Sequence, residues 1–263
     1  MNRNAILDAA AMPPASPSYP RGPYRFVDRE YFIVTYETDP AAIRAALPEP
    51  LEAVEEAVVH YEWIRMPDSQ GFGDYTESGL VIPCRFAGER CNFTLQMYLD
   101  DDPPIAAGRE IWGFPKKHAK PRLEVRTDTL TGTLHYAGEL VAMGTMHYKH
   151  HTCDAERARQ TLSRTQVNLK LIPGVDGRPA IAQLVGYNLT DIAVKGIWAG
   201  DARLHLVPHV NAPVADFPVR RIVGATHLVA DLTLPYGRVL HDYLFDERAP
   251  RSGTAHAHTS APR

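Results

Sequence analysis

The sequence predicts an α+β fold that is mainly antiparallel β, with few and short helices. Segments that mix β-branched or aromatic residues with partial alternation of apolar and polar positions are typical of half-buried strands, and they recur along most of the chain. Turn-like residues separate these segments at short spacing, which favours a barrel or a pair of packed sheets. No shift in composition divides the 263 residues, so we expect residues 18–247 to form a single domain.

The expected strands follow one another at short intervals. They cover residues 31–37, 58–65, 79–86, 92–99, 123–125, 129–136, 139–148, 185–194, 202–208 and 226–234. A first helix is expected over residues 41–47, because Asp39 can cap its first turn and Pro40 fits its first position. A second is expected over residues 154–162, again with an aspartate at its start, and a short turn is expected at residues 241–244.

The two ends of the chain differ from this domain. Residues 1–17 are rich in Ala, Pro and Ser and are expected to be a flexible lead-in. Residues 248–263 contain almost no large apolar side chain, so burial cannot offset the entropy cost of ordering them. We therefore expect residues 248–263 to be a disordered tail.

The composition excludes several classes of protein. A net charge of −3 provides no basic field that would hold nucleic acid or an anionic membrane. No apolar run reaches the length of about 18 residues that a membrane span needs, and Asp8 interrupts the short apolar run near the N-terminus. Three cysteines argue against a disulfide framework and fit a reducing compartment. We therefore expect a cytoplasmic protein.

The most informative segment is GREIWGFPKKHAKP at residues 108–121. Its adjacent lysines, Lys116 and Lys117, follow an apolar stretch that contains Trp112 and Phe114. A lysine pair in a loop is most often solvated, and lysine is almost never fully buried without a reason. The flanking aromatic rings favour burial of this segment, but they do not establish it alone.

Five further stretches accompany this segment in a fixed order. They are YPRGPYRFVDREYF (19–32), PEPLE (48–52), YTESG (75–79), MYLD (97–100) and YKH (148–150). Together with the lysine segment they resemble the acetoacetate decarboxylase family, from about residue 17 to residue 244. The resemblance implies a β-rich cone or barrel, assembly into homo-oligomers that are usually dodecamers, and no metal or organic cofactor. It also implies that a small β-keto acid is the substrate, with acetoacetate giving acetone and carbon dioxide.

The resemblance assigns roles to five residues. It makes Lys116 the lysine that forms a Schiff base with the substrate, and Lys117 a neighbouring charge. By their motifs, the family's active-site arginine and two glutamates fall on Arg29, Glu62 and Glu77. A guanidinium matches carboxylate geometry, so Arg29 is expected to orient the substrate carboxylate. Glu62 is expected either to shuttle protons or to place a like charge against that carboxylate. Without the resemblance, these three residues would be interpreted as a surface ion pair, a solvent-facing strand residue and a turn residue.

Imine formation requires Lys116 to be neutral. A free lysine has a pKa of about 10.4, so at neutral pH only about one amine in a few thousand is a nucleophile. Acetoacetate decarboxylase is the established example of a lysine activated by desolvation or by a neighbouring cation. Adjacent residues of an extended segment point to opposite faces, so Lys117 is expected to point away from the amine. We therefore expect desolvation to be the larger cause.

The walls that exclude water are expected to come from four apolar residues. They are Phe26, Met97, Trp112 and Phe114. In this arrangement Lys117 becomes a structural anchor, paired to a carboxylate such as Glu77.

Two other functions stay open at the level of sequence. A Schiff-base aldolase-dehydratase of the same superfamily would keep the lysine and release no carbon dioxide, although the joint presence of Arg29, Glu62 and Glu77 favours the decarboxylase. A non-catalytic β-barrel that binds a small apolar ligand would need no neutral lysine. A metal site is not expected, because the spacing of the stretch HYKHHTC at residues 147–153 fits no common zinc template.

Overall fold

The computed structural model describes residues 1–245, and strands make up most of this part of the chain. The strands are β1 (Tyr24–Glu37), β2 (Glu52–Ala53), β3 (Val58–Ser69), β4 (Gly73–Phe86), β5 (Glu89–Leu99), β6 (Lys116–His118), β7 (Lys120–Arg126), β8 (Thr129–Tyr136), β9 (Glu139–His147), β10 (His151–Thr152), β11 (Gln166–Pro173), β12 (Pro179–Tyr187), β13 (Thr190–Ala199), β14 (Ala202–Leu206), β15 (Arg221–Leu234) and β16 (Arg238–Asp242). The helices are α1 (Arg3–Leu7), α2 (Pro40–Ala46), α3 (Asp102–Ala107) and α4 (Ala155–Leu162), with a π-helical turn at Gly108–Trp112 and a 3₁₀ turn at Val214–Asp216. The predicted β-rich fold with few short helices is confirmed.

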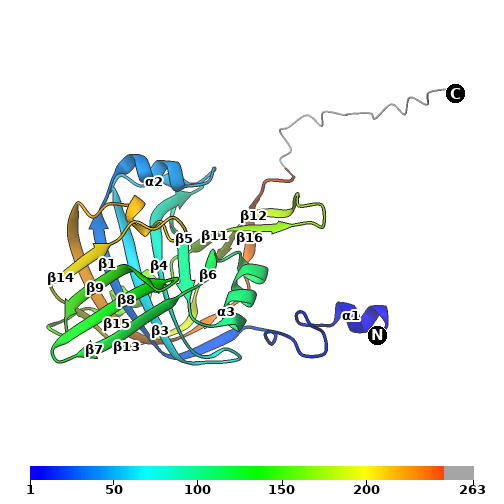
Figure 1. The fold of residues 1–263 in the computed structure, drawn as a ribbon, viewed down its shortest axis with the longest axis horizontal. Helices are drawn as coiled ribbons and strands as arrows, with labels where there is room; N and C mark the ends of the chain where they lie inside the picture. The colour runs from blue at the N-terminus through cyan, green and yellow to red at the C-terminus, as the bar shows by residue number, and fades with distance from the viewer. Residues whose placement is uncertain (246–263) are drawn as a thin grey trace.

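The strands form one large and one small sheet (Figure 1). The large sheet has twelve strands in the order β10-β13-β15-β1-β3-β4-β5-β11-β12-β16, with β2 added beside β4 and β6 beside β5. The small sheet has the order β14-β9-β8-β7. Most neighbours are antiparallel, and β5 pairs in parallel with both β6 and β11. Within residues 1–245 no ladder joins β10 to β16, so the large sheet does not close into a barrel through backbone pairing.

The main hydrophobic core lies between the two sheets. Phe32 and Trp63 from the large sheet stack with ring centroids 5.3 Å apart and pack in one cluster with Leu130 of the small sheet. Gly132 and Gly144 of the small sheet give the Trp63 ring its space, because a Cβ at either position would lie within 2.6 Å of a ring atom. Since side chains alternate across a strand, the neighbours of Phe32 and Trp63 face the opposite side of the large sheet.

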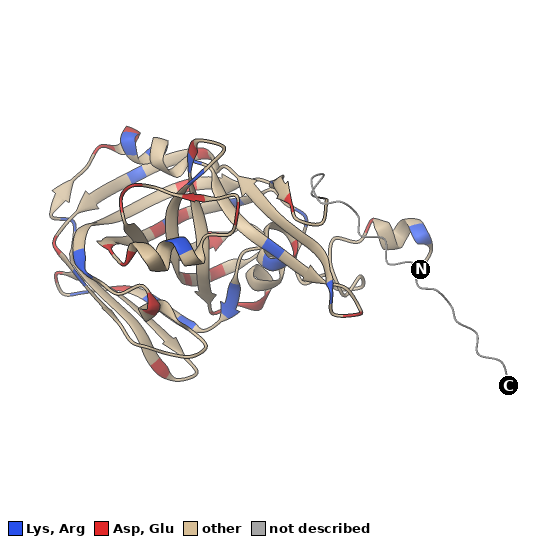
Figure 2. Ribbon diagram, turned by 90° about the horizontal axis from the view of Figure 1, so that it is seen from above, with Lys and Arg blue, Asp and Glu red and all other residues tan. Residues whose placement is uncertain are grey.

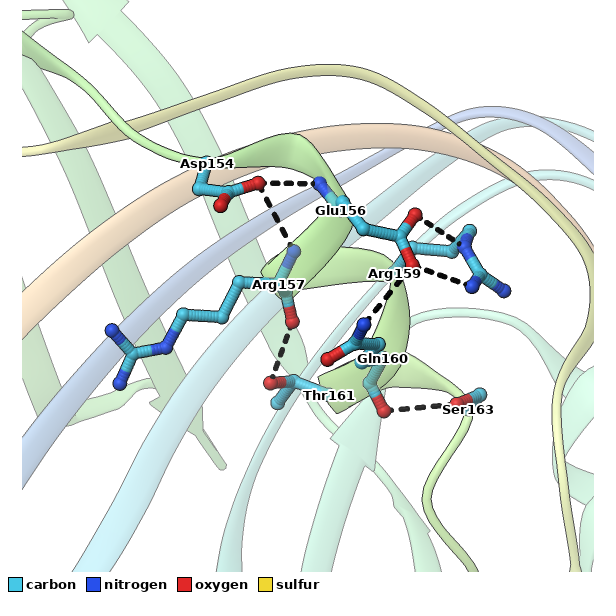
Figure 3. A network of polar contacts seen from close by, with 7 residues as sticks. All are labelled: Asp154, Glu156, Arg157, Arg159, Gln160, Thr161 and Ser163. Atoms are coloured by element: carbon cyan, nitrogen blue, oxygen red, sulfur yellow. Dashed lines mark hydrogen bonds and ion pairs between the residues drawn. The ribbon is translucent and has the colours of Figure 1, made fainter.

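Both predicted helices are present within one residue of their expected limits, and each begins after the predicted aspartate cap. The Asp39 carboxylate accepts a hydrogen bond from the Ala41 backbone N–H at 2.8 Å, and Pro40 occupies the first turn of α2. The Asp154 carboxylate accepts hydrogen bonds from the first backbone N–H groups of α4 (Figure 3). Within α4, Glu156 pairs with Arg159 on the exposed side of the helix (Figure 3). These caps satisfy N–H groups that would otherwise lack partners at a helix start.

Several strand predictions are wrong in their limits. The single strand expected over residues 185–194 is two strands, because β12 ends at Tyr187 and β13 begins at Thr190. Between them, the Asn188 side-chain amide donates to the Ser163 carbonyl at 3.0 Å, which fixes the chain outside the ladder. The apolar pattern runs through this break and conceals it. The turn expected at residues 241–244 begins only at Tyr243, after β16.

The N-terminal segment of the chain lies outside the two sheets. Residues 1–17, expected to be a flexible lead-in, include α1, which lies away from the sheets in Figure 1. The tail expected at residues 248–263 lies outside the described residues. Figure 2 shows that Lys and Arg positions are interspersed with Asp and Glu positions along the ribbon. Of the helices in residues 1–245, none has the length and apolarity to cross a membrane.

Candidate active site

A cavity of about 250 Å³ lies on the side of the large sheet that faces away from the small one. Its walls come from alternate residues of the central strands, such as Tyr31 and Ile33 in β1 and Glu62 and Ile64 in β3. The residues between them face the core, as the two-residue period of a strand requires. The sheet therefore divides its side chains into a structural face and a cavity face.

Lys116 projects into this cavity from β6. The short strand is held by parallel pairing with β5, in which Lys116 lies beside Met97. The lysine is 6% exposed, and its Nζ lies 2.6 Å from Oε1 of Glu77, which is also buried. The same Nζ lies 5.1 Å from the centre of the Phe114 ring and 5.7 Å from that of Tyr75. A charged or neutral amine at this position has aromatic and carboxylate neighbours and little access to solvent.

A glycine makes room for the lysine chain. A Cβ at Gly108 would lie 2.6 Å from Cδ, 2.8 Å from Cε and 3.2 Å from Nζ of Lys116. The residue after Gly108 also contacts this strand, because the Arg109 guanidinium donates to the Lys116 carbonyl at 3.2 Å. The π-helical turn thus forms the slot through which the side chain of Lys116 reaches the cavity. Sequence analysis missed Gly108, because no local sequence pattern shows that this glycine packs against the side chain of Lys116.

Burial determines the electrostatics of Lys116. Desolvation lowers its pKa from the ordinary value, and the positive charge of Arg29 acts in the same direction. The carboxylate of Glu77 opposes both through its charge and its close contact, but the net direction is downward. The amine therefore loses its proton more readily than that of a lysine in water.

The other predicted polar residues surround the amine. Arg29 and Glu62 line the same cavity, and the Arg29 guanidinium carbon lies 5.1 Å from the centre of the Phe26 ring and 4.9 Å from that of Tyr31. Burial raises the pKa of Glu62 to about 7, with Arg29 lowering it and the negative charge of Glu77 raising it. At neutral pH the Glu62 carboxyl group is therefore divided between its protonated and ionised forms.

Three of the four expected apolar walls line the cavity, and one does not. Phe26, Met97 and Phe114 are part of the lining. Trp112 instead packs behind Phe114, with ring centroids 6.1 Å apart, and its Nε1–H donates to the Pro235 carbonyl at 2.9 Å. The prediction for Trp112 is corrected accordingly, because the indole needs a hydrogen-bond acceptor and finds it outside the cavity.

Lys117 points away from the cavity, as alternation in β6 requires. Its Nζ donates to the Asn211 carbonyl at 2.5 Å and lies 5.0 Å from the centre of the Tyr136 ring. The expected pairing of Lys117 with Glu77 is wrong, because Glu77 lies on the cavity face and contacts Lys116. As expected from the sequence, Lys117 points away from the Lys116 amine, and desolvation is the first cause of the lowered Lys116 pKa.

Sequence analysis also missed three tyrosines of the cavity wall. They are Tyr31, Tyr75 and Tyr187. A signal was available for the first two, because Tyr31 and Tyr75 lie two positions from Arg29 and Glu77 and so share a strand face with them. Elsewhere, His147 and His150 stack with ring centroids 4.4 Å apart, and in the described part of the chain no three His, Cys, Asp or Glu side chains are grouped as metal ligands.

The fold and the cavity define a β-rich enzyme class in which a buried lysine faces a carboxylate inside an aromatic pocket. A family model described as acetoacetate decarboxylase matches residues 11–244. The acetoacetate decarboxylase of Acidiphilium cryptum is 58% identical over 236 residues, which cover 90% of this chain and 96% of that protein. The chain belongs to the acetoacetate decarboxylase family and is a carboxy-lyase.

Solved structures give the same result. The crystal structure of acetoacetate decarboxylase from Legionella pneumophila matches with a TM-score of 0.87 and 51% identity, covering 91% of this chain and 96% of that one. An enduracididine biosynthesis enzyme, at 20% identity and a TM-score of 0.77, covers 89% of this chain and 97% of its own. At that level of identity the second match extends to the fold alone.

Proposed function

We propose that Lys116 forms an imine with the ketone of acetoacetate and that this imine drives the loss of carbon dioxide. The observation that carries the proposal is a lysine amine buried among aromatic rings, with a pKa lowered by that burial. A neutral amine is the nucleophile that imine formation requires. The protonated imine is the electron sink, so the substrate must be a β-keto acid, in which one carbon separates the ketone carbon from the carboxylate carbon.

The reaction begins with attack of the neutral Lys116 amine on the ketone carbon. The resulting carbinolamine takes up a proton, loses water and becomes a protonated imine. Electrons of the bond between the carboxylate carbon and its neighbour then flow into the imine as carbon dioxide leaves, which gives a neutral enamine. The enamine takes up a proton on carbon and becomes the protonated imine of acetone. Water hydrolyses this imine and releases acetone, a proton and the neutral amine.

Arg29 and Glu62 have the chemistry that the remaining tasks need. Arg29 presents a guanidinium in the cavity, and this group binds carboxylates in a bidentate geometry. Glu62 has a pKa of about 7, which suits a group that both gives and accepts protons near neutral pH. Its second conceivable role, repulsion of the substrate carboxylate, requires the ionised form. In this proposal Lys117 anchors β6 instead of acting on substrate.

The proposal is tested by adding borohydride in the presence of acetoacetate and mapping the modified peptide. We expect an irreversible adduct on Lys116, together with release of acetone and carbon dioxide in the unreduced reaction. Lys116→Ala should give no adduct and should lose activity by roughly 10⁶-fold, the scale of removing a covalent nucleophile. An adduct without carbon dioxide would instead favour aldolase-dehydratase chemistry. Absence of any adduct would favour a non-catalytic barrel that binds a small ligand.

We also propose that the chain acts as a homo-oligomer, with the dodecamer implied by the family resemblance as the expected size. The family resemblance carries this part of the proposal, and exposed apolar side chains such as Leu171, Val210 and Tyr236 are available for contacts between copies. Light scattering coupled to size-exclusion chromatography measures the mass directly. A mass equal to that of one chain at micromolar concentration would contradict this part of the proposal.

A further inference from the structure

Tyr31 lines the cavity, and its buried hydroxyl group has no hydrogen-bond partner among the described residues. Tyr31 is 4% exposed and lines the cavity between Arg29 and Ile33 of the same strand. Its Oη is fully enclosed, and among residues 1–245 it makes no hydrogen bond. Buried polar groups in native proteins are nearly always paired, so an unpaired hydroxyl in a binding cavity indicates a partner that arrives with the ligand.

Two buried tyrosines outside the cavity lining show the usual arrangement. The Tyr36 hydroxyl, five positions along β1 on the core face, donates to the Phe217 carbonyl at 3.1 Å. The Tyr24 hydroxyl donates to the Pro20 carbonyl at 2.5 Å. Burial alone therefore does not leave a tyrosine hydroxyl unpaired in this fold.

The surroundings of Tyr31 identify the chemistry of the missing partner. The Arg29 guanidinium carbon lies 4.9 Å from the centre of the Tyr31 ring, so a cation is adjacent to the phenol. Burial raises the pKa of Tyr31 to about 12, against the lowering effect of Arg29, and the hydroxyl keeps its proton at neutral pH. A neutral O–H donor next to a guanidinium fits an anionic oxygen acceptor.

We propose that Tyr31 is a carboxylate-binding residue, whose hydroxyl donates a hydrogen bond to the carboxylate of the bound keto acid beside Arg29. Arg29 supplies the charge and Tyr31 supplies a directed donor, so together they fix the carboxylate in one orientation relative to Lys116. This inference rests on the proposed function only for the identity of the acid. Binding of a carboxylate is measurable without any imine.

The test compares Tyr31→Phe with Tyr36→Phe. Both variants lose one buried hydroxyl from β1, and Tyr31→Phe keeps the ring on which Arg29 packs. Butyrate, which has a carboxylate and no ketone, serves as the probe in calorimetric titration. We expect Tyr31→Phe to weaken butyrate binding by about 10- to 100-fold, the value of a hydrogen bond to a charged group, and Tyr36→Phe to leave it unchanged.

Acetone provides the complementary probe, because it forms an imine and has no carboxylate. Borohydride trapping of acetone on Lys116 should be equal in Tyr31→Phe and in the wild-type protein. With acetoacetate, KM should rise by about the same factor as the butyrate Kd while kcat changes less, as expected for lost uniform binding.

Two results would overturn the inference. Butyrate binding that is unchanged in Tyr31→Phe excludes a hydrogen bond to the carboxylate. Equal losses for butyrate and acetone show that the hydroxyl maintains the shape of the cavity instead. If the wild-type protein formed no adduct with either ketone, the proposed imine chemistry would fail, and the butyrate comparison would still decide the role of Tyr31.

Discussion

Two lysine–carboxylate pairs of this molecule have the same short N–O distance, but the pKa values of their lysines are shifted in opposite directions. Nζ of Lys116 lies 2.6 Å from Glu77 Oε1, and Nζ of Lys195 lies 2.6 Å from Asp231 Oδ1. The side chains are 7% and 4% exposed in the first pair and 40% and 18% exposed in the second. Burial lowers the pKa of Lys116, whereas hydrogen bonds to Asp231 and Asp28 raise the pKa of Lys195.

The difference shows that loss of hydration, and not the distance to a partner, sets the direction of the pKa change. A buried ammonium loses its water, and one carboxylate only partly replaces that hydration. A pair at the surface keeps most of its water, so the carboxylates add to an already favourable charged state and contribute little to folding. The buried pair is therefore an arrangement for chemistry more than for stability.

Among variants that keep Lys116, the largest expected effect comes from narrowing the slot through which this side chain reaches the cavity. In Gly108→Ala the new Cβ would overlap the end of the lysine chain, which is flexible and can move while the fold stays intact. Displacement of a reacting atom by about 1 Å costs roughly 10²-fold in rate, so kcat/KM for acetoacetate should fall by about that factor. Steady-state kinetics and a thermal melt check both statements.

Gly224→Ala is the matched control, because a Cβ there meets no atom within 4 Å. It should keep full activity. Full activity of Gly108→Ala would show that the amine does not need its observed position.

Removal of each carboxylate partner tests the comparison of the two lysine pairs directly. Glu77→Gln takes away the charge that raises the pKa of Lys116, so that pKa should fall further. The rate of borohydride trapping with acetone should therefore fall off at a lower pH on the acidic side of its pH profile. Asp231→Asn should leave the acidic side of this pH profile unchanged. Asp231 contacts Lys195, Arg25 and the backbone N–H of Asp28, and none of these residues lines the cavity of Lys116. If the acidic side of the pH profile moved to higher pH in Glu77→Gln, the inference that the charge of Glu77 raises the pKa of Lys116 would be contradicted.

Glu62 should make the protein less stable as the pH rises. Its pKa is about 7 in the folded protein against an ordinary value of 4.5, so between these values the folded state binds more protons than the unfolded state. The unfolding free energy should therefore decrease from pH 5 to pH 8, by about 1–3 kcal/mol from this group.

Glu62→Gln removes that contribution. Relative to the wild-type protein, the variant should gain stability at pH 8 and little at pH 5. Urea unfolding at both pH values and at one fixed protein concentration measures the difference. If the stability difference between the two proteins did not change with pH, the raised pKa could not be assigned to Glu62.

The smallest effect is expected at the second lysine. Lys117→Ala loses the contact with the Asn211 carbonyl and the ring of Tyr136, which should lower the unfolding free energy by about 0.5–1 kcal/mol. The pH dependence of trapping at Lys116 should hardly change. A return of the Lys116 pKa to nearly its free value would mean that charge from Lys117, and not burial, activates the amine.

Much of the fold could be predicted from the sequence because strands carry a local signal. Alternation located at least half of each of β1, β3 and β4, up to one end of the strand, and the aspartates at positions 39 and 154 located both predicted helices. The pattern failed at Asn188, where a side-chain hydrogen bond to a distant carbonyl interrupts an apolar run. It also missed β11, because the residues of this strand lack a clear alternating pattern. Its pairing with β5 and β12 establishes the strand in the structure.

In the candidate site too, some features follow from local sequence and others from contacts between distant segments. The sequence by itself determined the residue types, the family, and the opposite directions of Lys116 and Lys117, since a period of two residues is a local property. Only the tertiary structure decided that Glu77 contacts Lys116, that Trp112 lies behind the cavity wall, and that Gly108 opens a path for the amine. The physical reason is that burial and pairing depend on which distant strands meet, and solvent exclusion is a property of the whole assembled sheet.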